Sequence, residues 1–209
     1  MSNDFINNIS RKLQKDLPGA RIQYQMAPSI RYGNGNPVEC NKGAVLILLY
    51  PEKSSVSTIL IKRSEDDGPH SGQISFPGGR SDPGDKDLFE TALREAEEEI
   101  GIKRNKVIIL GSITPLYIPP SNIEVLPVIA YSKDKPVFQP SKKEVNFLIS
   151  VEMEQLKNPK TRQVKKVKYD NREVLVPYYN IDGNHIWGAT AMILSEFLEV
   201  IKNIPLNFV

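Results

Sequence analysis

Apolar residues along the chain fall into two patterns, short continuous runs and runs at helical spacing. Runs of about four to eight apolar or β-branched residues bounded by Gly, Pro, Asn, Asp or Ser are typical of strands. The clearest covers residues 44–50, which carry no charge and therefore predict a buried strand. By this criterion we predict strands over residues 44–50, 58–63, 73–76, 107–113, 125–131, 147–151, 164–169 and 173–179.

Longer segments repeat apolar residues every three or four positions, which predicts amphipathic helices. The first is expected to stop at Pro18-Gly19, since proline and glycine both end helices. Asp170-Asn171 predicts the turn of a hairpin, because both residue types tolerate positive φ. The expected helices cover residues 4–17, 88–100 and 189–201, with a short helical turn between residues 152 and 159.

Strands and helices mixed along the whole chain indicate an α/β protein whose sheets carry helices on their outer faces. We see no internal repeat, low-complexity segment or linker, so we expect a single domain over residues 1–209. Residues 1–40 form its N-terminal extension, a helix followed by a loop rich in Gly, Asn and Pro at residues 32–38.

Composition and charge exclude several classes of protein. The net charge is +2, so the protein has no broad positive potential that would attract nucleic acid. We interpret the alternating lysines of residues 162–168 as a solvated sheet edge. Cys40 is the only cysteine, which excludes an internal disulfide and a cysteine-based metal cluster. No apolar stretch approaches the length of a membrane span. We therefore expect a cytoplasmic protein without nucleic-acid or membrane partners.

The helix predicted over residues 88–100 carries the strongest chemical signal. At about 100° per residue, Glu95, Glu98 and Glu99 share an arc of about 100° on one side of it. Clustered carboxylates repel unless a cation lies between them, and hard divalent cations prefer oxygen ligands. An acidic solvated face is the alternative, but the preceding Gly78-Gly79 turn favours a metal site. The apolar residues that share another side of the helix are Phe89, Leu93, Ala96 and Ile100.

Residues 78–102 resemble the Nudix box, the signature of hydrolases that act on nucleoside diphosphates linked to another group. Residues 94–102 match the second half of that pattern completely. The first half matches when one inserted residue is allowed, with Asp85 in place of the early glutamate and Gly79 as the glycine. The resemblance implies a Nudix-type α/β/α sandwich with a mixed β-sheet and a catalytic loop and helix.

The residues around this box resemble the coenzyme A diphosphatase branch of the family. Its Phe-Pro-Gly-Gly, Asp-x-x-Asp and Thr-Ala-Leu-Arg-Glu segments correspond to residues 76–79, 82–85 and 91–95. The upstream motif departs from the branch, because Gly68 stands where a second phosphate-binding arginine is expected. With Asp66 and Asp67 beside it, Gly68 predicts a weak preference for coenzyme A, and Arg63 or Arg80 would be the substitute cation.

The resemblance also implies roles for individual residues. Glu95, Glu98 and Glu99 would hold Mg²⁺ or Mn²⁺. Glu98, Arg94 and Glu144 would be catalytic, with a glutamate as general base and Arg94 orienting a glutamate of the helix. For Glu144, an exposed charge beside two lysines is the alternative. The implied substrate contacts are Arg63, Gly78 and Gly79.

The implied activity is metal-dependent hydrolysis of the diphosphate bond of coenzyme A or a related nucleoside diphosphate derivative. Hydrolysis of ADP-ribose or of dinucleotides on the same helix is one alternative, and a Nudix module that binds nucleotides without catalysis is another. We expect His70, His185 and Trp187 to be structural, with Trp187 packed beneath the last helix. The oligomeric state stays open, with a homodimer among the alternatives.

Overall fold

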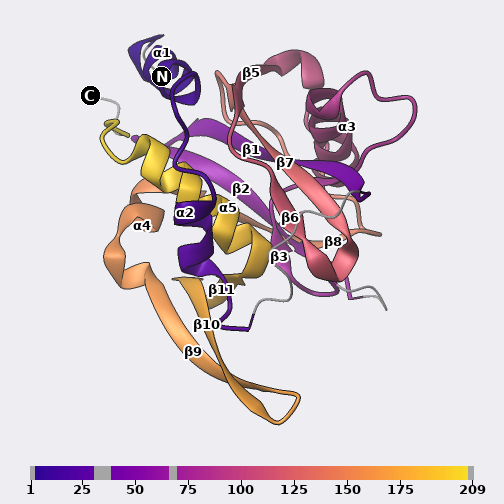
Figure 1. Cartoon of the computed structure of the whole chain (residues 1–209). Coiled ribbons are helices and arrows are strands. Elements are labelled where there is room, and N and C mark those ends of the chain that lie inside the picture. The colour runs from indigo at the N-terminus through magenta and orange to yellow at the C-terminus, as the bar shows by residue number, and fades with distance from the viewer. Residues whose placement is uncertain (1–2, 31–38, 66–69, 207–209) are drawn as a thin grey trace.

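The computed structural model describes residues 3–30, 39–65 and 70–206 (Figure 1). The strands in these ranges are β1 (Asn41–Glu52), β2 (Ser55–Arg63), β3 (Ile74–Ser75), β4 (Gly78–Arg80), β5 (Val107–Ser112), β6 (Leu116–Ile118), β7 (Ile123–Ser132), β8 (Val145–Glu152), β9 (Arg162–Tyr169), β10 (Arg172–Ile181) and β11 (Asn184–Trp187). The α-helices are α1 (Asn3–Leu13), α2 (Ala20–Gln23), α3 (Leu88–Ile100), α4 (Met153–Lys157) and α5 (Gly188–Ile201). Short 3-10 helices are η1 (Tyr24–Met26), η2 (Arg104–Lys106), η3 (Pro119–Ser121) and η4 (Pro159–Thr161).

Within the described ranges, the strands belong to two sheets. The larger is mixed and has eight strands, with the main path β3-β2-β1-β7-β5 and with β4 on β1, β6 on β7 and β8 on β2. β1 and β7 pair in parallel, whereas β1 and β2 are antiparallel. The smaller sheet has the order β11-β10-β9.

The larger sheet is covered on both faces, because side chains of its central strands alternate between two hydrophobic clusters. In β1, Leu46 and Leu48 belong to the cluster that includes α3, whereas Ile47 and Leu49 belong to the cluster that includes α5. Figure 1 shows α3 on one side of the sheet and α5 with α2 on the other. The chain is therefore an α/β/α sandwich with a mixed sheet, as the sequence predicts.

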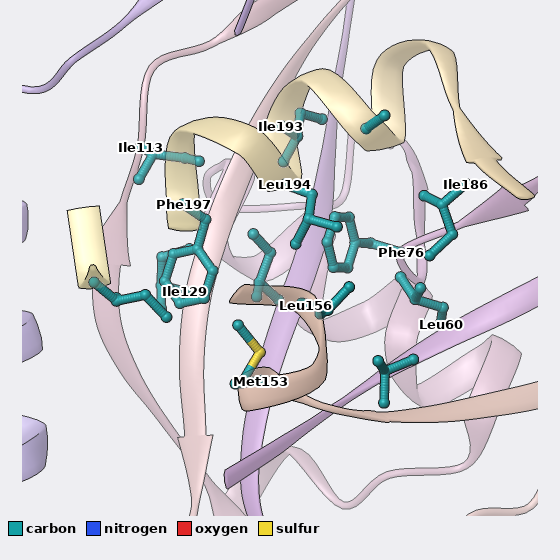
Figure 2. Close-up of a cluster of buried hydrophobic side chains, with 14 of the residues drawn as sticks. Leu60, Phe76, Ile113, Ile129, Met153, Leu156, Ile186, Ile193, Leu194 and Phe197 are labelled. Carbon is teal, nitrogen blue, oxygen red and sulfur yellow. The ribbon is translucent and has the colours of Figure 1, made fainter. Parts of the chain in front are cut away.

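The cluster beneath α5 fixes the segment that leads into the glycines (Figure 2). Leu194 and Phe197 project from α5 toward the sheet, and Met153 and Leu156 belong to the same cluster from α4. Phe76 lies among them with only 2% of its surface exposed. Since Phe76 comes directly before Pro77-Gly78, its burial anchors the start of β4.

Most predicted elements are present, and the differences have physical reasons. The first helix ends at Leu13 rather than at residue 17, and residues 16–18 have no regular structure. Residues 78–80, predicted as a turn, form strand β4 against residues 43–45 of β1. β6 and β11, of three and four residues, were absent from the prediction because such short segments carry no periodic signal. The predicted loop at residues 32–38 lies outside the described residues.

The predicted hairpin is confirmed and extends away from the two helical layers (Figure 1). Asp170 and Asn171 have φ values of 48° and 59°, as a two-residue turn of this type requires. β9 forms the edge of the smaller sheet, and most of its residues are exposed, as expected for a solvated edge. No helix in the described part of the chain is long and apolar enough to cross a membrane.

A buried carboxylate joins the N-terminal extension to the last helix. Glu196 of α5 is fully buried and accepts hydrogen bonds from the Gly19 amide at 3.0 Å and from Gln23 Nε2 at 2.7 Å. The Thr114 hydroxyl donates to the same side chain at 2.7 Å. Hydrogen bonds to a charged acceptor are stronger than neutral ones, so this network holds α2 against α5.

We predict that Glu196→Ala lowers the free energy of unfolding by about 3 kcal/mol or more, because several buried donors lose one charged acceptor. Urea unfolding followed by circular dichroism measures the change. Glu199→Ala on the same helix is the matched control: Glu199 forms a surface ion pair with Lys202, and its loss should cost less than about 1 kcal/mol. Equal effects of the two substitutions would contradict a structural role for Glu196.

Candidate functional site

Helix α3 is fixed at both ends and along its apolar side. Asp87 caps its start, because its side chain accepts a hydrogen bond from the Glu90 amide at 2.9 Å. Gly101 ends the helix in the left-handed conformation with φ 70°. Ala92 and Ala96 are fully buried against the sheet, so small side chains bring the helix close to β1.

Strand β4 passes close to β1 at Gly78 and close to the end of the Glu95 side chain at Gly79. Gly78 has φ 152°, and a Cβ there would lie 2.6 Å from the Cα of Val45. A Cβ on Gly79 would lie 2.5 Å from the carboxylate carbon of Glu95. Both glycines therefore lie in a closely packed strand rather than in the predicted sharp turn.

Glu99 is the most buried of the predicted site carboxylates. Its side chain is 4% exposed, and its two oxygens accept hydrogen bonds from the Gly78 amide at 2.8 Å and from Arg63 Nη1 at 3.2 Å. Burial raises the pKa of Glu99 to about 7, although Gly78 and Arg63 act in the opposite direction. Arg63, at the end of β2, is thereby placed beside the glycines and the helix.

Glu144 reaches the same region from the loop before β8. Its carbonyl accepts the Ser64 amide at 2.9 Å, which fixes it next to the end of β2. Burial raises the pKa of Glu95, and the negative charges of Glu98 and Glu144 raise it further. Glu144 likewise raises the pKa of Glu99. Glu144 is therefore an exposed residue that also lies within electrostatic range of the carboxylates of α3.

Arg94 connects the glutamates to the acidic loop. Its guanidinium makes two bonds to Asp85, from Nε at 2.8 Å and from Nη2 at 3.0 Å. Nη1 donates to Glu95 at 2.8 Å and to Glu98 at 3.3 Å. This bidentate contact holds the pKa of Asp85 well below its usual range. The pairing of Asp85 with Arg94 could not be predicted from the sequence, because no helix or strand repeat relates two residues nine positions apart across a loop.

The predicted metal ligands, Glu95, Glu98 and Glu99, do not all point to one position in this structure. Within the described ranges, no three acidic, histidine or cysteine side chains form a ready-made ligand set. Glu98 is 54% exposed and bonded to Arg94, while Glu99 is bonded to Gly78 and Arg63. However, the negative charges of Glu95 and Glu144 add to burial in raising the pKa of Glu99, and all three side chains offer oxygen atoms as ligands. This donor set suits a hard divalent cation such as Mg²⁺ or Mn²⁺.

Other residues singled out from the sequence lie apart from these carboxylates. Trp187 is 38% exposed at the end of β11, so its predicted burial beneath α5 is wrong: its strand position turns it outward just before the helix begins. The His185 ring packs on Tyr178 with centroids 4.5 Å apart, and His70 Nδ1 lies 3.4 Å from Gln73 Oε1. Gly68 and its two neighbouring aspartates lie outside the described residues.

Relatives whose family is known align with most of this chain. An uncharacterized Nudix hydrolase, NudL, of Yersinia enterocolitica is 31% identical over 213 residues, which cover 97% of this chain and 100% of the relative. The mitochondrial Nudix hydrolase 15 of Arabidopsis thaliana is 33% identical over 175 residues, covering 80% of this chain and 61% of the relative.

Solved structures share the fold at lower identity. The Nudix hydrolase RenU of M. smegmatis has a TM-score of 0.53 and 18% identity over 79% of this chain and 89% of its own. A MutT/nudix family protein of Enterococcus faecalis has a TM-score of 0.53 and 15% identity over 97% of this chain and 75% of its own. The NUDIX domain pattern itself matches residues 41–178, more than half of the sequence. The chain therefore belongs to the Nudix hydrolase family.

Proposed function

We propose that this Nudix hydrolase cleaves the diphosphate bond of coenzyme A or of a related nucleoside diphosphate derivative, in a metal-dependent reaction. The observation that carries the proposal is the meeting of Glu95, Glu99 and Glu144 beside the glycines of β4, with Arg63 bonded to Glu99. Negative oxygens for a cation and a guanidinium for phosphate are what diphosphate hydrolysis requires.

The proposed metal ligands are Glu95, Glu98 and Glu99, as the resemblance implied. When bound, Mg²⁺ or Mn²⁺ supplies neutralisation of phosphate charge and an activated water. Glu99 is held by the Gly78 amide, so its carboxylate keeps one orientation. Glu98 is exposed and reaches the site through Arg94, so it would have to move to join the other two.

The proposed catalytic residues act around this group. Glu144 or Glu98 takes the proton from the attacking water, since both are exposed carboxylates at the edge of the site. Arg94 keeps Glu95 oriented, because its other nitrogens are held by Asp85. Arg63 binds a phosphate oxygen of the substrate, for which its 32% exposed side chain is available.

The glycines bring β4 close to the carboxylates. Gly78 and Gly79 carry no side chain, so the strand can pass against β1 and against the Glu95 carboxylate, where a diphosphate bound to the metal would lie. Coenzyme A is the proposed substrate because the segments around the Nudix box resemble that branch. Within the same proposal, residues 1–209 form one domain, since the N-terminal extension packs on α5 through Glu196. We also propose that the protein acts in the cytoplasm.

We predict that Glu99→Gln lowers kcat for diphosphate hydrolysis by on the order of 10²–10⁴-fold, because the amide cannot supply the negative charge. Product formation from coenzyme A with Mg²⁺ or Mn²⁺ measures the effect, and circular dichroism checks that the fold is kept. The control is Glu97→Gln on the same helix, where Glu97 pairs with Arg104 at the surface and activity should change by less than about threefold. Full activity of Glu99→Gln would exclude Glu99 as a metal ligand.

Alanine substitutions at the two adjacent glycines should affect different properties, activity at Gly79 and stability at Gly78. Gly79→Ala meets only the end of the flexible Glu95 side chain, so the fold should be kept while Glu95 moves and kcat falls about 100-fold. Gly78→Ala meets the backbone of β1 at a φ of 152°, so it should lower the free energy of unfolding by about 2 kcal/mol or more. Thermal unfolding and steady-state kinetics of both variants separate the two effects. A stable Gly78→Ala protein, or a fully active Gly79→Ala protein, would contradict this packing.

The substrate assignment has its own test. We predict hydrolysis of coenzyme A with a preference over ADP-ribose of only about 10- to 100-fold in kcat/KM, since the expected second arginine is replaced by Gly68. A panel of coenzyme A, ADP-ribose and dinucleotides, assayed with Mg²⁺ and with Mn²⁺, measures the ratios. Binding of these compounds without hydrolysis would instead identify a non-catalytic module.

A further inference from the structure

The C-terminal end of α3 is bonded to the loop of residues 138–144, which carries Glu144 (the 138–144 loop). The Gln139 amide donates to the Ile100 carbonyl at 2.8 Å, and the Ser141 amide donates to the carbonyl of residue 99 at 2.9 Å. The last carbonyls of a helix have no partner inside the helix, so these two amides satisfy groups that would otherwise need water. The path of the loop is therefore tied to the last turn of α3.

Ser141 passes this connection on to Glu144. Its carbonyl accepts the Glu144 amide at 3.2 Å and the Val145 amide at 2.9 Å. Two consecutive backbone hydrogen bonds thus link Glu99 to Glu144, with Ser141 between them. Glu99 holds the loop with its carbonyl and contributes its side chain to the carboxylate site. The charge of Glu144 raises the pKa of Glu99, as expected for carboxylates that lie near each other.

Gly101 allows the loop to reach the end of the helix. A Cβ on Gly101 would lie 2.7 Å from the Cβ of Gln139 and 2.9 Å from its carbonyl oxygen. Both distances are shorter than ordinary contacts between such atoms, which begin at about 3.5 Å. A side chain at residue 101 would therefore push residue 139 away from α3, in addition to the strain that a φ of 70° imposes on it.

Phe138 fixes the start of the loop by an aromatic contact. Its ring meets the ring of Tyr50 edge to face, with centroids 5.4 Å apart and an angle of 63° between the planes. Tyr50 is fully buried, and its hydroxyl lies 2.8 Å from Ser150 Oγ, so the contact rests on a fixed partner. It lies roughly 20 Å along β1 from the residues that pair with β4. The neighbouring Val137 is 80% exposed and contributes no such anchor.

We propose that the 138–144 loop is a positioning element, in which Phe138 and Gly101 keep the loop on the end of α3 and thereby fix Glu144 beside the carboxylates. This inference rests on the proposed function and assigns the transfer of the proton from water to Glu144. A general base must lie within hydrogen-bond reach of the proton that it takes. Phe138 and Gly101 do not contact the reacting atoms, so they act only through the position of the loop.

The first test is a substitution at Phe138 combined with one at Glu144. Phe138→Ala should lower kcat for coenzyme A about tenfold and leave KM within about twofold, because the base is misplaced while the substrate contacts remain. In a Glu144→Gln protein the same substitution should cause no further fall, since the group whose position it sets is gone. An equal fall in both backgrounds would identify a general structural role and overturn the inference. Val137→Ala is the matched control and should leave kcat within about twofold.

The second test compares two glycines with left-handed backbone. Gly101 and Gly183 have φ values of 70° and 84°, but a Cβ on Gly183 would have no atom within 4 Å. Alanine at either position should lower Tm through backbone strain. Only Gly101→Ala should also lower kcat, by about tenfold or more, and this fall should be absent in the Glu144→Gln background. Equal activities of Gly101→Ala and Gly183→Ala would contradict the proposed contact, and Phe138→Ala keeps the test available if Gly101→Ala does not fold.

Amide hydrogen exchange of the metal-free protein, followed by NMR, separates this inference from the proposed function. The amides of Gln139, Ser141 and Val145 should be protected, and Phe138→Ala should reduce their protection about tenfold or more, whereas Val137→Ala should not. Unchanged protection in Phe138→Ala, or lost protection with unchanged kcat, would overturn the inference. Full activity of Glu144→Gln would overturn it as well and leave the diphosphatase intact. An unmodified protein that hydrolyses no diphosphate would contradict the proposed function, while the expected changes in exchange would still support the attachment of the loop to α3.

Discussion

The rest of the site depends on how closely strand β4 approaches helix α3. The Gly78 amide donates to Glu99 at 2.8 Å, so strand and helix share a hydrogen bond at the point where the carboxylates gather. Glycine at residue 78 permits this approach, because a side chain there would overlap the backbone of β1, while a side chain at residue 79 would displace the Glu95 carboxylate. A carboxylate buried with partial compensation is unfavourable when charged, and the pKa of Glu99 rises to about 7 for that reason. Functional sites often retain such locally unfavourable groups.

Packing elsewhere in the molecule holds the unfavourable arrangement in place. Ala92 and Ala96 let α3 lie close to the sheet, while Phe76 anchors the entry to β4 on the opposite face. Asp85 holds Arg94 with two bonds, so Glu95 receives a hydrogen bond from a guanidinium that is itself fixed. The two hydrophobic clusters and the acidic loop therefore provide the rigidity that a cluster of repelling charges lacks.

The end of β2 connects the two regions of chemical interest. Arg63 is bonded to Glu99 of the carboxylate site, and its neighbour Lys62 lines a cavity beside Trp187. Consecutive residues of a strand point to opposite faces of the sheet, as Leu60 and Ile61 do in the two hydrophobic clusters, so Lys62 and Arg63 serve different surfaces. The end of β2 thus contributes one residue to each region, and a substitution at either residue can be tested independently of the other.

The sequence by itself determined the order of the long elements and the carboxylate-bearing helix, because hydrophobic periodicity is a local signal. It also identified the family through residues 78–102. Only the tertiary structure decided which groups meet. The arrival of Glu144 from the loop before β8 joins elements far apart in sequence. The contact of Asp85 with Arg94 depends on the path of the loop between them, and the outward position of Trp187 depends on how β11 pairs with β10. Such meetings arise from sheet pairing and packing across the core, for which a single chain carries no periodic signal.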